Sequence, residues 1–146
     1  MRLSHKGEYG LMALLELAAR HGDGPQQAAA VAAAREIPPQ YLPQILLSLR
    51  QAGLVRSTRG PRGGHELGRA PEQITLQEAV EALEGTGSGG CAVGASGAGC
   101  GRQDQCALLE VWRRVDAAMA AVLAQVTLAD LVRRERELLA APMYFI

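Results

Sequence analysis

Residues 41–67 read YLPQILLSLRQAGLVRSTRGPRGGHEL, and their pattern predicts a helix followed by a β-hairpin. In its first half, apolar residues recur at steps of three and four, the spacing of one face of a helix: Tyr41, Leu42, Ile45, Leu46 and Leu49. Ala52-Gly53 ends this helix, because glycine is favoured just beyond a helix C-terminus. Residues 54–59 and 65–67 are extended stretches around the glycine-rich turn 60–64, and they predict a β-hairpin.

Two further helices are predicted on the N-terminal side. The first covers Glu8 to Arg20, in which Leu11, Leu14, Leu15 and Ala18 share one face. The second is the alanine-rich segment Gln26–Arg35, which Ile37-Pro38-Pro39 separates from the next helix. Helix, turn, helix and hairpin in this order are typical of a winged helix-turn-helix, whose second helix enters the major groove while the hairpin lies on the backbone or in the minor groove.

The C-terminal half predicts three more helices. Gln77 to Leu83 forms a short one that Gly85 ends. Residues 106–126 form a helix roughly 30 Å long, too long and too apolar for the head to cover, so we expect it to pack on a partner. Thr127 with Asp130 resembles a capping box and begins a final helix over residues 128–140. The fold class is therefore mainly α with a small β-hairpin wing.

Composition narrows the class of protein. The chain has 146 residues, 48% hydrophobic and 21% charged, which fits one globular head with an appendage. No segment approaches the roughly 20 uninterrupted apolar residues of a membrane span, so we expect a cytoplasmic protein without a membrane partner. The net charge is +0, and binding to nucleic acid must therefore come from a local patch.

Such a patch is present around the hairpin. Five arginines and one acid, Glu66, lie between residues 50 and 69, for a local charge of +4, whereas residues 72–84 carry four acids and no base. Arg59 and Arg62 flank Pro61 at the hairpin tip, where a guanidinium can enter a narrow minor groove or grip a phosphate. The alternative is an ordinary solvated hairpin.

A second cluster consists of the chain's three cysteines. Cys91, Cys100 and Cys106 lie within 16 residues, in a segment with eight glycines between residues 85 and 101. Three soft thiolates suit an iron-sulfur cluster or zinc, although zinc sites usually contain cysteine pairs two to four residues apart. Either site needs a fourth ligand, which the cysteines leave unassigned. Three unrelated buried cysteines are the remaining alternative.

The motifs together resemble the Rrf-two family of bacterial transcription regulators over essentially the whole chain. The residues that carry the resemblance are Met1-Arg2-Leu3-Ser4, Lys6-Gly7, Tyr41-Leu42, Gln44, Leu49-Arg50, Ala52-Gly53-Leu54-Val55, Arg59-Gly60-Pro61, Gly63-Gly64, Ile74-Thr75-Leu76 and 127–131. The resemblance implies a homodimer that pairs through the long helix and binds a pseudo-palindromic operator. We accordingly expect a DNA-binding domain over residues 1–84, a cysteine loop over 85–105 and a dimerisation region over 106–146.

The resemblance also implies which residues contact DNA. Gln40, Tyr41 and Gln44 match the recognition helix, and Arg59 matches the wing arginine that reaches the minor groove. We also expect Arg50, Arg62 and His65 to contact DNA. Tyr41 is alternatively a half-buried core residue. This sequence departs from the family at three positions, with Pro43 for a glutamate, Arg62 for a glycine and His65 for a tyrosine. A proline there disfavours helical geometry at the preceding residue, so we expect the helix to begin late.

For the cysteines, the resemblance implies an iron-sulfur cluster, and we expect 2Fe-2S rather than 4Fe-4S. Leu109 stands where one branch of the family has a histidine ligand. Glu8 matches a carboxylate that reaches the cluster across the dimer in another branch, and it is the candidate fourth ligand, with His5 as second choice. Alternatively, Glu8 simply occupies a first helical turn, where the helix dipole favours acids.

These observations predict a dimeric transcriptional regulator, a repressor, whose operator binding depends on a cluster sensing redox state, nitric oxide or iron-sulfur status. The alternative is a metal-free regulator in which Cys91, Cys100 and Cys106 are oxidised directly. We do not expect an enzyme, because the three histidines lie in separate elements and no catalytic signature is present. A protein-interaction adaptor would explain the long helix but gives Arg59 no role.

Overall fold

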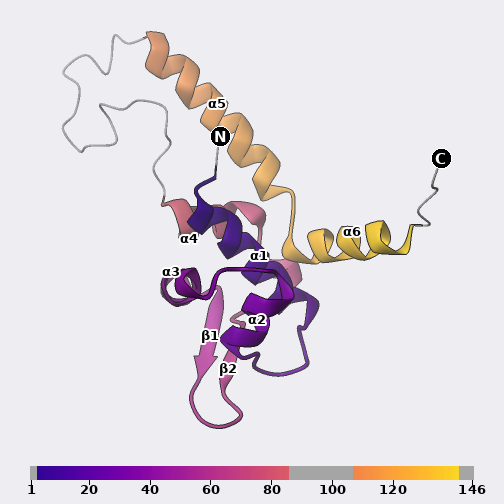
Figure 1. Ribbon diagram of the computed structural model, residues 1–146. Helices are drawn as coiled ribbons and strands as arrows, with labels where there is room; N and C mark the ends of the chain where they lie inside the picture. Colours follow the sequence, from indigo (N-terminus) through magenta and orange to yellow (C-terminus); the bar gives the residue numbers. More distant parts are fainter. Residues whose placement is uncertain (1–2, 86–106, 142–146) are drawn as a thin grey trace.

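The computed structural model describes residues 3–85 and 107–141, which form several helices and one small hairpin that projects from them (Figure 1). The helices are α1 (His5–Ala19), α2 (Ala28–Ala34), α3 (Leu42–Gln51), α4 (Leu76–Glu84), α5 (Ala107–Ala124) and α6 (Leu128–Ala140). Strands β1 (Val55–Thr58) and β2 (Gly64–Leu67) pair antiparallel, and two 3-10 turns, η1 (Pro39–Tyr41) and η2 (Pro71–Gln73), precede α3 and α4. The expected mainly α fold with a hairpin wing is confirmed.

The head is built around one apolar core. α3 turns the predicted stripe inward, and Leu42, Ile45 and Leu49 are at most 2% exposed. α1 supplies Ala13, Leu14, Leu17 and Ala18 to the same core, and the hairpin supplies Val55 and Leu67. Burial of these side chains removes apolar surface from water and fixes how α3 and the hairpin lie relative to α1.

The start of α3 differs from the sequence-based expectation. The helix begins at Leu42, whose backbone is α-helical (φ −62°, ψ −41°), with Pro43 in its first turn. The prediction of a late start is wrong, because amides in the first turn have no intrahelical acceptor and a proline there costs no hydrogen bond. Gln40 and Tyr41 lie in η1, immediately ahead of the helix.

Helices α4 and α6 begin side by side. Thr75 and Thr127 each accept a bond from the amide three residues on, and Glu78 and Asp130 complete the two capping boxes. The backbones also pair, since Leu76 N donates to Val126 O (2.8 Å) and Leu128 N to Ile74 O (3.0 Å). The predicted capping box at Thr127 is confirmed, and this pairing fixes α6 to the head.

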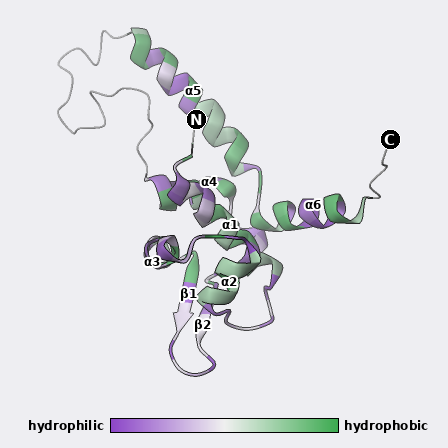
Figure 2. Cartoon of the chain, viewed as in Figure 1, coloured by the Kyte–Doolittle hydropathy of each residue, from purple (hydrophilic) through white to green (hydrophobic). Residues whose placement is uncertain are grey.

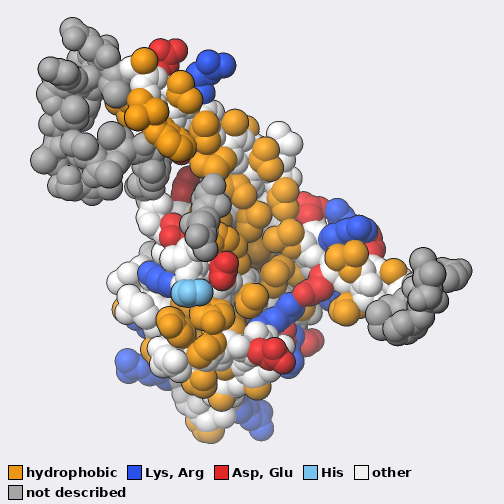
Figure 3. Space-filling view, turned by 45° about the horizontal axis from the view of Figure 1, so that its top comes forward, with side chains coloured by type: hydrophobic (Ala, Val, Ile, Leu, Met, Phe, Trp, Pro, Cys, Tyr) orange, Lys and Arg blue, Asp and Glu red, His pale blue; other side chains and the backbone are white. Residues whose placement is uncertain are grey.

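Helix α5 leads away from the head with its apolar residues uncovered (Figures 1 and 2). None of its residues is buried, and the most exposed large apolar side chains are Leu108 (60%), Val111 (53%) and Val122 (64%). In the space-filling view, apolar side chains gather along this helix and continue over the head below it (Figure 3). No helix within residues 3–85 and 107–141 is long and apolar enough to cross a bilayer.

A buried carboxylate on α1, through Arg35, joins this helix to the end of α2 and to α6. Glu16 is only 7% exposed, and it accepts bonds from Arg20 (2.5 Å) and from Nε of Arg35 (2.9 Å), the residue that follows α2. The other side of the Arg35 guanidinium binds Glu135 of α6 in a bidentate pair. The bond to Glu135 raises the pKa of Arg35, and the same bond lowers the pKa of Glu135.

We expect Arg35→Ala to lower the free energy of unfolding by about 2 kcal/mol or more, because it removes a partner from the buried Glu16 carboxylate. Arg134→Ala is the matched control, since Arg134 pairs with Glu137 on the exposed side of α6. Its effect should stay within about 1 kcal/mol. Urea unfolding followed by circular dichroism measures both, and equal losses would contradict this role for Arg35.

Candidate nucleic-acid interface

The face of α3 opposite the core is exposed and polar at most positions. Gln44 and Arg50 are exposed on it, and Gln40 is exposed in the adjoining η1 turn. Amide side chains can pair with adenine edges in the major groove. Arg50 lies in the last turn of α3, where a cation is favoured by the helix dipole. These three predicted contacts are thus all accessible, with Gln40 and Gln44 at or just before the start of α3 and Arg50 at its end.

Tyr41 lies at the border between this face and the core. Its side chain is 38% exposed, and its ring centroid is 5.2 Å from that of Tyr9 on α1. Tyr9 is itself half-buried and stacks on His5 at 6.2 Å. Tyr41 is therefore supported on one side by α1 and accessible on the other.

The five arginines of the basic segment divide into two groups. Arg56 pairs with Glu66 across the hairpin (2.9 Å), and Arg69 pairs with Glu78 of α4 (2.8 Å). The other three, Arg50, Arg59 and Arg62, are exposed and form no ion pair within the described residues. The positive charge available to a polyanion is thus concentrated at the end of α3 and the tip of the wing.

The wing tip is a tight turn that depends on two glycines. Gly63 N donates to Gly60 O (2.9 Å), and Gly60 has a positive φ of 115° that other residues rarely adopt. A Cβ at Gly63 would lie 2.1 Å from the carbonyl oxygen of Thr58. This tight turn presents Arg59 and Arg62 on its outside.

Two glutamines ahead of α2 hold the wing against the head. Gln26 exchanges two backbone hydrogen bonds of 2.8 Å with His65, and the side chain of Gln27 donates to the carbonyl oxygen of Gly63. The backbones approach so closely that a Cβ at Gly64 would lie 2.5 Å from the Gln26 carbonyl oxygen. Sequence analysis missed these residues; the Gly63-Gly64 pair is the signal of close backbone approach.

His65 is half-buried on β2 rather than free at the surface. Its Nδ1 lies 2.9 Å from Oγ of Ser57, the residue opposite it in the hairpin. Burial, followed by the positive charge of Arg50, lowers the pKa of His65. The lowered pKa favours the neutral form of His65, so a histidine in place of a tyrosine adds no charge to the wing at neutral pH.

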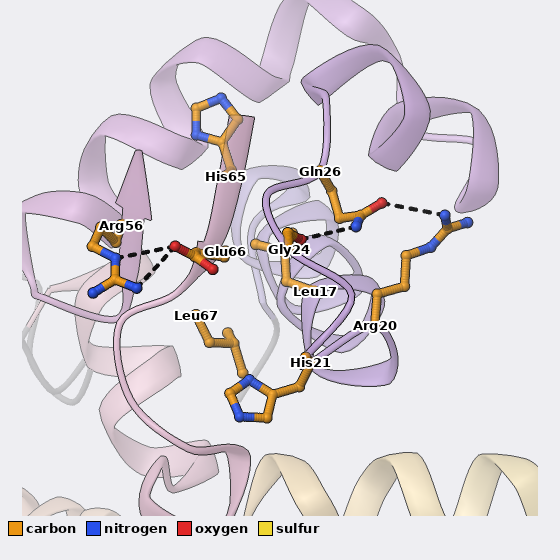
Figure 4. A pocket seen from close by; sticks show the side chains of 10 residues that line it. Leu17, Arg20, His21, Gly24, Gln26, Arg56, His65, Glu66 and Leu67 are labelled. Carbon is orange, nitrogen blue, oxygen red and sulfur yellow. Dashed lines mark hydrogen bonds and ion pairs between the residues drawn. The ribbon is translucent and has the colours of Figure 1, made fainter. Parts of the chain in front are cut away.

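A cavity of about 210 Å³ lies between the hairpin and the end of α1 (Figure 4). Its polar side chains are largely occupied with one another: Arg56 binds Glu66, Arg20 binds Gln26, and Gln26 donates to the carbonyl oxygen of Gly24. The first of these bonds lies within the wing and the other two within the turn between α1 and α2, and the backbone pairing of Gln26 with His65 joins the two sides. The cavity is best explained as part of the support of the wing.

The candidate cluster ligands are only partly within the described structure. Cys91, Cys100 and Cys106 lie outside the described residues. Glu8 is exposed in the first turn of α1, and its carboxylate is 3.8 Å from Nδ1 of His5. No group of three or more metal-binding side chains occurs in the parts of the chain that the structure covers, which include none of the three cysteines.

Comparison with known proteins decides the family. Residues 3–134 match the model of the Rrf2 family, described as iron-dependent transcriptional regulators. The chain belongs to the Rrf2 family. It is 37% identical over 131 residues to the transcriptional regulator CymR of Bacillus subtilis (90% of this chain, 89% of CymR) and 36% identical over 138 residues to IscR of Cereibacter sphaeroides (92% and 89%).

Solved structures agree with this assignment. The structure of CymR, titled the global cysteine regulator of B. subtilis, has a TM-score of 0.73 at 35% identity and covers 92% of this chain and 98% of its own. IscR of T. potens has a TM-score of 0.75 at 33% identity and covers 99% and 95%. The resemblance to the Rrf-two family is confirmed. This Rrf2 protein is thus a winged-helix transcriptional regulator and not an enzyme.

We expect Arg59→Ala to weaken binding to an operator duplex selected in vitro with the wild-type protein. The slope of log affinity against log salt concentration should fall in magnitude by about 0.9, the contribution of one phosphate contact. Arg56→Ala is the matched control, because it changes the net charge equally but removes an arginine already paired with Glu66. Fluorescence anisotropy over a salt series measures both slopes, and equal changes would contradict the assignment.

Proposed function

We propose that this Rrf2 protein is a homodimeric repressor whose affinity for a pseudo-palindromic operator is controlled by an iron-sulfur cluster bound to Cys91, Cys100 and Cys106. The observation that carries the DNA-binding part is the arginine set Arg50, Arg59 and Arg62, exposed and outside the ion pairs of the head. The observation that carries the sensing part is the placement of three thiols in one glycine-rich segment between head and α5.

In this proposal, α3 lies in the major groove with the wing beside it. Gln40 and Gln44 offer amides to base edges, and Tyr41 borders them. Arg59 and Arg62 reach a minor groove or the phosphates from the wing tip, where guanidinium forks match phosphate geometry. Arg50 and His65 contact the backbone between these two elements.

The dimer is proposed from the uncovered face of α5. A helix with five large apolar side chains at least 38% exposed is unstable in water without a covering surface: Leu108, Val111, Trp112, Val115 and Val122. A second copy of α5 supplies such a surface, and two-fold symmetry then places two winged heads on two half-sites. The proposed division of the chain is therefore a DNA-binding domain over 1–84, a cysteine loop over 85–105 and a dimerisation region over 106–146.

The donor set fits an iron-sulfur cluster. Thiolates are the usual ligands of such clusters, and a 2Fe-2S cluster with three of them needs one more. We assign this place to Glu8 of the partner subunit, because the Glu8 carboxylate is exposed at the start of α1. A bound cluster supplies sensitivity to redox state and to small ligands such as nitric oxide, and a hard oxygen ligand leaves one iron more weakly held.

A second candidate is a metal-free thiol regulator that uses the same three cysteines. The solved relatives include CymR of Staphylococcus aureus in an oxidised form, with a TM-score of 0.67 and 32% identity over 90% of this chain. Direct oxidation of Cys91, Cys100 or Cys106 to a sulfenic acid or a disulfide would change the same segment without a metal.

Protein purified without oxygen distinguishes these candidates. We expect a brown protein with iron and acid-labile sulfide in equal amounts, and loss of both in Cys100→Ala. The ratio per chain and the visible bands separate 2Fe-2S from 4Fe-4S. A colourless protein that takes up no iron on reconstitution, but whose operator affinity changes on mild oxidation, would overturn the cluster and support the thiol regulator.

We expect Glu8→Gln to retain the cluster but to shift its visible spectrum and to shorten its lifetime in air, because an amide is a weaker ligand than a carboxylate. His5→Ala is the matched control, since His5 lies next to Glu8 in the same exposed turn and is the second-choice ligand. A spectrum that changes in His5→Ala and not in Glu8→Gln would assign the ligand to His5 instead.

A further inference from the structure

The last residue of α4 caps the first turn of α1, although 80 residues separate them. Glu84 Oε1 accepts hydrogen bonds from the backbone N–H of Ser4 (3.0 Å) and from its hydroxyl (2.6 Å). Ser4 in turn caps α1, because its Oγ accepts a bond from Gly7 N (3.1 Å). A carboxylate at this end of α1 is further stabilised by the helix dipole.

Gly7 leaves the room that this carboxylate occupies. A Cβ at position 7 would lie 2.0 Å from Glu84 Oε1, and a Cβ at Gly10, one turn on, would lie 2.3 Å from Leu83 Cδ2. Glycine inside a helix is unfavourable for the helix itself. Two glycines on one face of α1 are therefore explained by close contact with the end of α4.

The same two turns of α1 also support the beginning of the recognition helix. Tyr9, two residues after Gly7, packs partly on the core, and its ring lies against Tyr41 with an interplanar angle of 49°. Tyr41 immediately precedes α3. The start of α1 thus contacts both the residue that precedes the glycine-rich cysteine segment and the residue that precedes α3.

We propose that Glu84 and Tyr9 are positioning residues that make the placement of Tyr41 and of the first turn of α3 depend on the state of the cysteine segment. This inference rests on the proposed sensing function. A change of state that draws Gly85 away from the head takes the Glu84 carboxylate off Ser4. The first turn of α1 then loses a cap, Tyr9 shifts, and Tyr41 loses its support, so that the equilibrium moves between two arrangements of the DNA-reading surface.

Two variants break the first contact in different ways. Glu84→Ala removes the carboxylate, whereas Gly7→Ala keeps it but displaces it by a methyl group while favouring the helix. Tyr9→Leu leaves the Ser4 and Glu84 bonds intact and breaks the second contact. Glu81→Ala is the control, because Glu81 is exposed one turn earlier on α4 and bonds to Gln77.

The measured quantity is the ratio of operator affinities in two cysteine states, cluster-loaded against cluster-free, or reduced against oxidised if the protein binds no iron. We expect Glu84→Ala, Gly7→Ala and Tyr9→Leu each to reduce this ratio about fivefold or more, within the usual range of allosteric coupling. Glu81→Ala should leave the ratio unchanged. A wild-type ratio of one would refute the sensing function itself, whereas a large ratio that persists in all three variants would overturn only the positioning role.

Amide hydrogen exchange gives a readout that does not depend on DNA or on a loaded cluster. In cluster-free, reduced protein, we expect Glu84→Ala to speed exchange in residues 5–10 and also in residues 39–44. Glu84→Gln, which keeps one acceptor oxygen, should have a smaller effect on both segments. Faster exchange confined to residues 5–10 would show a simple loss of a helix cap and would overturn the link to α3.

Discussion

Everything in the head depends on the burial of α1, because α2, α3, α4, α6 and β2 all pack on this one helix. Small residues on α1 permit this crowding, and Ala13 is fully buried. Burial also imposes a cost, since the Glu16 carboxylate lies in the crowded part and a buried charge is unfavourable without hydrogen-bonded partners. Arg35 meets that need, and its second contact with Glu135 extends the constraint to α6. The positions of α3 and of α6 are therefore set by the same helix.

The elements governed by local rules could be predicted from the sequence. The stripe of α3 follows from apolar spacing, and the start of α6 follows from the Thr127 capping box, because both depend on residues a few positions apart. The rule that proline disfavours helical geometry is also local, but Pro43 lies in the first turn of α3, where the rule does not hold. The contacts of Ser4 with Glu84 and of Gln27 with Gly63 join residues far apart in the chain, and no periodic pattern in the sequence marks them. No pattern in a single sequence indicates which distant polar residues will meet.

The charges show how a molecule with no net charge obtains a positive surface. Glu66 and Glu78 pair with Arg56 on β1 and with Arg69, which follows β2, and these two ion pairs hold the base of the wing in place. Arg50 at the end of α3 and Arg59 and Arg62 at the wing tip form no ion pair within residues 3–85 and 107–141. A count of charges along the sequence overstates the number of arginines without an acidic partner, but it places them in the right part of the chain. What decides DNA binding is therefore the distribution of partners, not the total.

In the proposed dimer, DNA binding is sensitive to small displacements, because the two copies of α3 must match half-sites about 34 Å apart, one turn of the double helix. Each head is carried by α6, through the Thr75 and Thr127 backbone pairing, and by the contacts of α1. The proposed sensor in the segment between α4 and α5 does not need to unfold either head of the proposed dimer. It needs only to shift the start of α1. There, the chain leading into the cysteines and the chain leading into α3 contact the same helix.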